Sequence, residues 1–214
     1  MVYKIPHIAR DVRIAIDENK TSEQLISLGD IETLSLDDII HSKIVEAVRR
    51  VEINAPVYML DSGNNFGDAV FWEANGSGWV LLPDDFMRLI SFRMSDWERT
   101  VYEAISTDDV KYPVQASRYK GIRGNCQKPV CAMTMRPEGK ALEFYSCKNR
   151  DAKVVQAVYL PYPRIENCQE EIGIDICIRC YTAVIYTTAA LVCLAFGADD
   201  RTSVFMELAK SALI

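Results

Sequence analysis

The sequence predicts an α+β fold, in which a helical bundle carries an inserted antiparallel β-rich part. Three observations support this prediction: an apolar run over residues 172–196, a capped amphipathic helix over 36–53, and a hairpin signature centred on 136–140. The chain has 214 residues, of which 49% are hydrophobic and 25% charged, as in soluble globular proteins with a sizeable core.

The first predicted element is a helix that begins near Pro6 and extends to Asn19. Proline is tolerated in the first turn of a helix. Apolar residues then recur at helical spacing: Ile8, Val12, Ala15 and Ile16. The alternation of Val12, Ile14 and Ile16 would also suit a strand, but the helical spacing is favoured.

A polar connector over 20–33 leads to the strongest helix signal in the N-terminal part. Ser35 and Asp38 form a capping-box pattern, which predicts a helix from Leu36 to about Ile53. Its apolar residues form one stripe, expected to be buried: Leu36, Ile40, Ile44, Ala47, Val48 and Val51. Asn54 and Pro56 are expected to end the helix.

The middle of the chain is predicted to be β-rich. A Gly- and Asn-rich stretch, 61–78, reads as a long loop around a short strand or wedge at 70–72. Strands are expected at 79–82 and 88–94, with a turn at 83–86 between them. Residues 128–135 and 141–147 flank the turn sequence Arg-Pro-Glu-Gly-Lys and should pair as a hairpin. Another strand is expected at 153–160.

Two segments of this middle part allow alternatives. Ser95 and Glu98 have the form of a capping box, so 95–105 is expected to be a short helix, with an extended arm as the alternative. Residues 119–128 are expected to form a solvated loop. Its basic residues could contact phosphate, although a cluster of this size is usually ordinary surface: Arg118, Lys120, Arg123 and Lys128.

The C-terminal run is predicted as one helix from Ile172 to Phe196, with capping residues at Asn167 and Glu170. No charged side chain occurs from Cys180 to Gly197, so this helix must be enclosed by other elements. Gly197 suits the position after the last turn, and 200–213 should form a second helix that pairs with the first. The predicted domains are therefore a bundle of 1–60 and 166–214 and an insertion of 61–165, forming one structural unit.

The uncharged part of this run also reaches the lower length limit of a membrane span. Thr182, Thr187 and Thr188 dilute it, and no basic cluster marks a cytoplasmic side. A buried bundle helix is therefore preferred, and no membrane partner is expected.

The sequence shows no catalytic motif, so neither enzymatic activity nor a cofactor is expected. The two histidines are far apart in sequence, and neither accompanies a nucleophile signature. Seven cysteines include a C-x4-C pair, Cys126 and Cys131, and a C-x-x-C pair, Cys177 and Cys180. We expect them to be small hydrophobic residues and predict no metal site, and a cysteine-based zinc or redox protein is the alternative of a different class.

The order of these features resembles that of the head-tail connector proteins of short-tailed bacteriophages, and most closely the ring proteins of crAss-like phages. The most suggestive segment is Trp79 to Leu89, which reads WVLLPDDFMRL. It lies between the capped N-terminal helix and Trp97, and is followed by Lys128-Pro129-Val130, the hairpin and an Ala-rich C-terminal helix pair. The resemblance covers nearly the whole chain.

The resemblance implies a virion structural protein of the tail or neck, assembled in the bacterial host cytoplasm. Such proteins form homo-oligomeric rings, typically of twelve subunits, below the portal protein. They continue the DNA channel and dock other tail or ring proteins. The net charge of −6 suits a channel through which packaged DNA passes without specific binding. Another ring of the tail barrel, further from the portal, is the alternative.

A closed ring needs two different complementary patches on each subunit. We predict one patch on the segment from Trp79 to Phe86 and one on the loop before it, with these interface residues: Phe71, Trp72, Trp79, Leu82, Pro83, Asp84, Asp85 and Phe86. The alternative is that these residues form a core strand and a turn.

Overall fold

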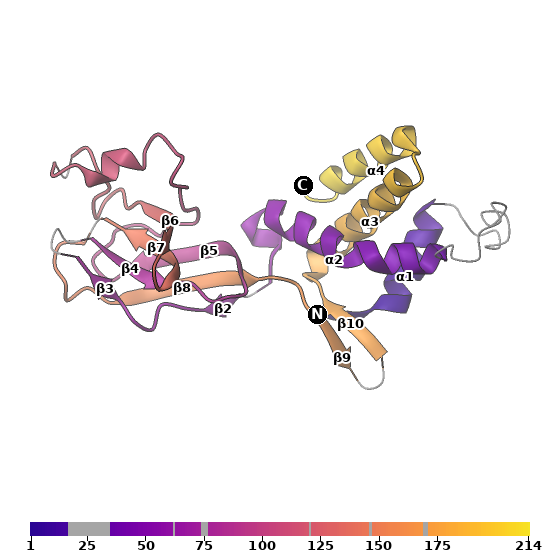
Figure 1. Ribbon diagram of the computed structural model, residues 1–214, viewed down its shortest axis with the longest axis horizontal. Coiled ribbons are helices and arrows are strands. Elements are labelled where there is room, and N and C mark those ends of the chain that lie inside the picture. Colours follow the sequence, from indigo (N-terminus) through magenta and orange to yellow (C-terminus); the bar gives the residue numbers. More distant parts are fainter. Residues whose placement is uncertain (17–34, 62, 74–76, 120, 146, 169–170) are drawn as a thin grey trace. The chain divides into compact units, whose positions relative to one another are not determined.

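The computed structural model describes the chain except for residues 17–34, 62, 74–76, 120, 146 and 169–170 (Figure 1). The chain is divided into two compact units. Unit 1 consists of Met1–Asp61 and Pro163–Ile214, and unit 2 is Ser62–Tyr162. The predicted α+β class is confirmed, because N-terminal helices and a C-terminal helix pair enclose antiparallel sheets in the chain order.

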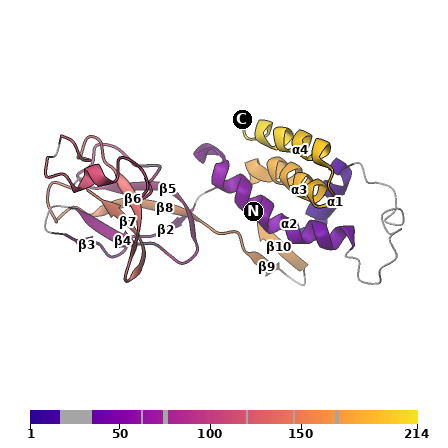
Figure 2. The ribbon, with the colours of Figure 1, turned by 45° about the horizontal axis from the view of Figure 1, so that its top comes forward.

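Unit 1 contains the predicted helices. They are α1 (Ile5–Ile16), α2 (Leu36–Asn54), α3 (Tyr181–Ala195) and α4 (Asp199–Ser211). The predicted end of the first helix at Asn19 and the polar connector 20–33 lie outside the described residues. Helix α4 packs along α3, and α1 and α2 also contact α3 (Figure 2). Gly197 joins α3 to α4 with a φ of 71°, the left-handed conformation expected of a residue after a helix end.

Helix α2 begins with the predicted capping box. The amide of Asp38 donates to Ser35 Oγ at 3.2 Å, and the amide of Ser35 donates to Asp38 Oδ2 at 3.1 Å. These two bonds satisfy amides that have no partner within the helix. The predicted stripe is buried, with Ile40, Ile44 and Val48 fully inaccessible to solvent.

Removal of this cap is expected to destabilise α2. In Ser35→Ala the amide of Asp38 loses its acceptor, which should cost about 1 kcal/mol of unfolding free energy. Urea unfolding followed by circular dichroism at 222 nm measures this loss. Ser42→Ala is the matched control, because Ser42 Oγ only donates to the Ile39 carbonyl in the same helix. An equal loss in both variants would show that the cap has no special role.

Helix α3 is the central helix of the unit 1 core. Ten of its fifteen residues are buried, including Thr187 and Thr188, and Thr188 Oγ1 donates to the Val184 carbonyl at 2.8 Å. The stretch Ile178–Ala195 has a mean hydropathy of 1.6 and is, within the described residues, long and apolar enough to cross a membrane. However, 61% of this stretch is buried by the rest of the fold, as expected of a core helix.

The prediction that the C-terminal helix begins near Ile172 is wrong. Residues Glu171–Asp175 form strand β10, which pairs on one side with β1 (Val2–Lys4) and on the other with β9 (Ile165–Cys168). Asn167, the predicted cap, lies in β9, and Glu170 lies outside the described residues. Gly173 allows β1 to approach closely, because a Cβ there would lie 2.6 Å from Val2 Cγ1.

Unit 2 contains two antiparallel sheets. One has the order β2-β8-β5 and the other the order β3-β4-β7-β6 (Figure 1). Their strands are β2 (Asn64–Asn65), β3 (Phe71–Trp72), β4 (Gly78–Leu81), β5 (Phe86–Met94), β6 (Cys131–Arg136), β7 (Gly139–Phe144) and β8 (Val154–Pro161). The predicted strands and the hairpin of β6 and β7 are therefore confirmed, and Gly139 adopts the φ of 135° that the tight turn requires.

Aromatic side chains from both sheets form a common core in unit 2. Phe92 of β5 lies 5.8 Å, between ring centroids, from Phe144 of β7, and Trp97 contacts both rings edge-on. Phe66 also belongs to this cluster, and its ring centroid lies 6.0 Å from that of Phe92. The two sheets thus pack face to face as a sandwich with an aromatic interior.

The predicted short helix at 95–105 is wrong, and the extended alternative is correct. Val101 exchanges backbone hydrogen bonds with Phe92, and Ile105 bridges to the edge strand β6 next to Ala132. Trp97 is buried in the aromatic core. The capping-box pattern does not produce a helix here, because these long-range pairings satisfy the hydrogen-bonding groups of the backbone in place of helical hydrogen bonds. The connection also contains a 3-10 turn, Pro113–Ala116.

Candidate interface site

The predicted interface residues are divided between the surface and the core of unit 2. Phe71 stacks on Trp79 with ring centroids 4.1 Å apart and an interplanar angle of 13°. Phe71 is 41% exposed and covers Trp79, which is only 8% exposed. Trp72 is half-buried and packs edge-on against Phe144. On this strand pair, Phe71 is therefore the ring available to a partner.

The turn that follows strand β4 is held by contacts with the core of unit 2. Leu82 and Phe86 are buried, and the Phe86 amide donates to the Pro83 carbonyl at 3.0 Å. Tyr159 donates its hydroxyl to Asp85 Oδ1 at 2.8 Å, so Asp85 braces the turn against β8. Asp84 is the exposed residue of the turn, and Pro83 is half-buried. Most of the LPDDF segment therefore has a structural role, and Asp84 is the member with a free surface.

A polar network lies beside the Phe71–Trp79 stack. The guanidinium of Arg136 lies 5.3 Å from the centre of the Trp79 ring and bonds to Glu73 at 2.7 Å and to Glu143. Tyr145 donates its hydroxyl to Glu143, whose side chain is only 10% exposed. Burial and the adjacent Glu143 carboxylate both raise the pKa of Tyr145, so this hydroxyl remains a donor. The network neutralises a carboxylate that the sheet has buried.

A cavity of about 670 Å³ adjoins this turn and the C-terminal half of strand β6. Its wall includes Leu82, Phe86 and two methionines, Met133 and Met135, that are partly or largely exposed. Methionine side chains are flexible and polarisable, and they adapt to different partner shapes. The wall also includes Arg136, Lys140 and Glu143, so the cavity is a hollow of mixed polarity next to the predicted interface segment.

The connection from 95 to 130 carries exposed apolar residues that the sequence reasoning did not select. Large side chains along it face solvent: Tyr102 (59%), Val110 (85%), Val114 (37%), Tyr119 (58%) and Ile122 (63%). Long connections with little regular structure are commonly functional. The available signal was the length of this segment, which was hidden because part of it was interpreted as a helix.

Of the basic residues predicted near this connection, the structure describes three, and one of these is buried. Arg118 lies over the Tyr119 ring at 5.1 Å and is exposed. Arg123 is buried, and Lys120 lies outside the described residues. Arg118 and Lys128 therefore remain as solvent-facing cations of this predicted cluster.

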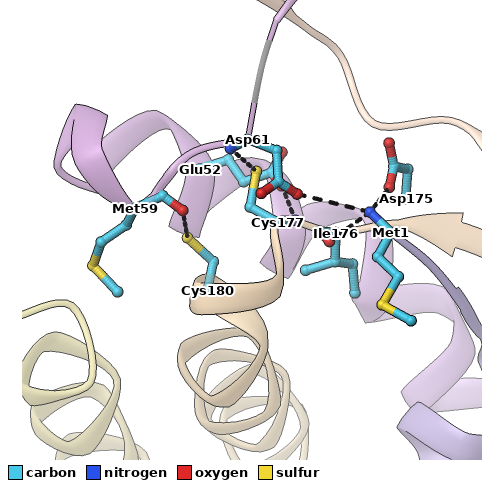
Figure 3. A network of polar contacts seen from close by, with 8 residues as sticks. All are labelled: Met1, Glu52, Met59, Asp61, Asp175, Ile176, Cys177 and Cys180. Atoms are coloured by element: carbon cyan, nitrogen blue, oxygen red, sulfur yellow. Dashed lines mark hydrogen bonds and ion pairs between the residues drawn. The ribbon is translucent and has the colours of Figure 1, made fainter.

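Unit 1 holds a second polar site, around Cys177 and Cys180 (Figure 3). These cysteines do not lie in mid-helix as predicted, because the 3-10 turn Ile178–Cys180 precedes α3. The Cys177 amide donates to the buried carboxylate of Glu52 at 3.1 Å, and the Asp61 amide donates to Cys177 Sγ at 3.3 Å. Nearby, the N-terminal amine of Met1 bonds to Asp175 and lies 3.8 Å from Asp61.

Burial dominates the protonation of Glu52 and raises its pKa, although the hydrogen bond from Cys177 opposes this shift. The hydrogen bond from the Cys177 thiol lowers the pKa of Cys180, and the same bond raises the pKa of Cys177. Cys126 and Cys131, the other predicted pair, belong to unit 2. Across the described residues, no three His, Cys, Asp or Glu side chains meet in a metal-binding arrangement.

Comparison with known protein families gives no match to this chain. A search of curated proteins likewise finds no relative.

Proposed function

We infer that this protein is a structural subunit of a bacteriophage virion, a head-tail connector that assembles with further copies into a ring below the portal. In this position the ring continues the DNA channel and docks the tail. The inference is supported by the resemblance of Trp79 to Leu89 and of the element order to connector proteins. The α+β fold with an inserted sandwich is compatible with it.

The main structural support is the exposed apolar surface of unit 2. Phe71 on strand β3 and three residues of the 95–130 connection are large side chains exposed to solvent: Val110, Tyr119 and Ile122. A continuous patch of exposed apolar side chains marks a protein-protein contact surface, and we propose that these residues belong to such patches. Two such surfaces, one on a sheet and one on a connection, provide the two different patches that a head-to-tail ring requires.

The distribution of charge also supports a channel. Unit 1 contains 18 acidic and 11 basic residues, a net charge of −7, whereas unit 2 contains 12 acidic and 13 basic residues, a net charge of +1. A negatively charged wall repels the phosphates of DNA, and it therefore lets packaged DNA slide without binding. We propose that unit 1 contributes this wall.

The assembled mass tests the proposal. Purified protein, alone and with the portal protein of the same phage genome, is measured by native mass spectrometry and particle imaging. A ring of twelve subunits would have a mass of about 290 kDa, given 24.2 kDa per chain. A ring that forms without binding the portal would favour a position further down the tail. Absence of both self-association and portal binding would overturn the proposal.

Single substitutions then identify the two patches. Val110→Glu and Phe71→Glu each place a charge in one proposed contact and should abolish assembly, since an unpaired charge in an interface is costly. Val155→Glu is the matched control, because Val155 is 64% exposed but lies on β8, outside both patches. Equal assembly of all three variants would show that these patches are not the interface.

A further inference from the structure

We propose that Cys177 and Cys180 form a reversible, redox-active dithiol that converts to an intramolecular disulfide. This modification site is separate from the ring-forming surfaces and does not depend on the proposed function. It is inferred from the turn geometry, the contacts of the two thiols and their position at the start of α3.

The backbone already places the two cysteines at a bridgeable distance. The Cys180 amide donates to the Cys177 carbonyl at 2.8 Å, which closes a turn of residues 177–180. Such a turn holds its first and fourth Cα atoms within about 7 Å, and disulfides span about 4.4–6.8 Å between Cα atoms. The pKa of each thiol is shifted by the other, as expected of neighbouring sulfur atoms, and Figure 3 shows Cys180 Sγ facing the Met59 carbonyl and Cys177 Sγ facing the Asp61 amide.

The surroundings distinguish the roles of the two sulfurs. Cys180 directly precedes α3, where the positive end of the helix dipole stabilises a thiolate. The hydrogen bond from Cys177 adds to this effect and lowers the pKa of Cys180. Cys177 retains slight solvent exposure, whereas Cys180 has none. Cys180 is therefore the more readily formed thiolate, and Cys177 is the sulfur with the slightly greater access to solvent.

The oxidant is a low-molecular-weight disulfide such as oxidised glutathione. One of the two cysteines loses its proton and attacks one glutathione sulfur, which forms a mixed disulfide and releases one glutathione thiolate. The other cysteine loses its proton and attacks the protein sulfur of this mixed disulfide, the protein disulfide forms, and the second glutathione thiolate leaves. Two protons are released from the protein thiols and taken up by the two glutathione thiolates.

The turn of residues 177–180 contacts residues 59–61, after which the chain passes from unit 1 into unit 2. The Cys180 thiol faces the Met59 carbonyl at 3.9 Å, and Cys177 Sγ accepts from the Asp61 amide. Disulfide formation removes the thiol proton of Cys180 and with it this contact to Met59. The oxidation state of the pair thus alters how residues 59–61 are held against the start of α3.

Trypsin provides a direct assay, because Arg179 lies between the two cysteines. The full-length protein is equilibrated in glutathione buffers of increasing oxidised fraction, denatured in acid, alkylated and weighed. Oxidation of the pair should reduce the number of alkylated cysteines from seven to five. Digestion should then yield peptides 165–179 and 180–201 joined by a disulfide, with fragmentation locating the link at Cys177 and Cys180.

Cys177→Ser and Cys180→Ser should each abolish the joined peptides, and Cys126→Ser is the matched control that should retain them. Circular dichroism of each variant confirms folding, and the wild-type titration decides the proposal even if a variant unfolds. Seven alkylated cysteines in every buffer would overturn it. Joined peptides that persist in Cys177→Ser, or a disulfide found only at other cysteines, would overturn it equally.

Discussion

Replacement of Phe144 by alanine is expected to lower the unfolding free energy of unit 2 by about 3–5 kcal/mol. Phe144 is fully buried, and its ring contacts Trp72, Phe92 and Trp97. Its removal leaves a cavity between the two sheets, because three aromatic rings lose a shared neighbour. These rings come from β3, β5 and the 95–105 segment, so a single substitution weakens the packing of each.

Tryptophan fluorescence during urea unfolding measures this loss selectively. All three tryptophans, Trp72, Trp79 and Trp97, belong to unit 2, so the signal reports on this unit alone. Met135→Ala is the matched control in the same sheet, because Met135 is 72% exposed and its truncation should change stability by less than about 0.5 kcal/mol. Similar losses in the two variants would contradict the sandwich core.

The substitution Arg136→Met is expected to cost unit 2 about 2–3 kcal/mol. Methionine retains an aliphatic stem over Trp79, but Glu143 loses its cation while 90% of its side chain remains buried. An uncompensated buried carboxylate is costly, and the partial exposure of Arg136 keeps the effect below that of a fully enclosed pair. The change should appear in the midpoint of the same fluorescence transition.

Two further variants isolate the electrostatic part of this effect. Glu143→Gln in the Arg136→Met background removes the stranded charge and keeps an acceptor for Tyr145, so it should recover about half of the loss. Arg50→Met breaks the exposed pair with Glu46 on α2 and should cost less than about 0.5 kcal/mol. If the double variant loses as much unfolding free energy as Arg136→Met alone, the effect of Arg136→Met is due to packing.

The elements that the sequence predicted correctly have local signals. The cap of α2 depends on Ser35 and Asp38, three residues apart, and the β6–β7 hairpin depends on a turn at 136–139. In both, the residues that determine the structure are neighbours in the chain, so their pattern is visible without knowledge of the fold.

The errors concern segments whose partners are distant in sequence. Ile172, Ile174 and Ile176 alternate with Gly173 and Asp175, which suits a strand as well as the beginning of an apolar helix. Pairing of this segment with residues 2–4 makes it a strand, and no local sequence pattern predicts that pairing. Similarly, Val101 and Ile105 are held extended by Phe92 and Ala132.

The candidate interface was predictable only in part. Phe71 and Asp84 are exposed, but Leu82 and Phe86 belong to the core, and Asp85 braces the turn. A conspicuous motif cannot reveal whether its residues face a partner or their own core, because burial depends on the second sheet. The interface role of these residues remains a prediction.

The interleaved chain order of unit 1 affects its synthesis on the ribosome. Helices α1 and α2 emerge first, but α3, against which they bury their apolar stripes, follows an insertion of about 100 residues. At about 5–20 residues per second, this delay is roughly 5–20 s. Unit 2 is continuous in sequence and can complete its sandwich during that interval. The apolar stripes of the nascent N-terminal helices stay exposed until α3 is synthesised, so they are a binding surface for chaperones.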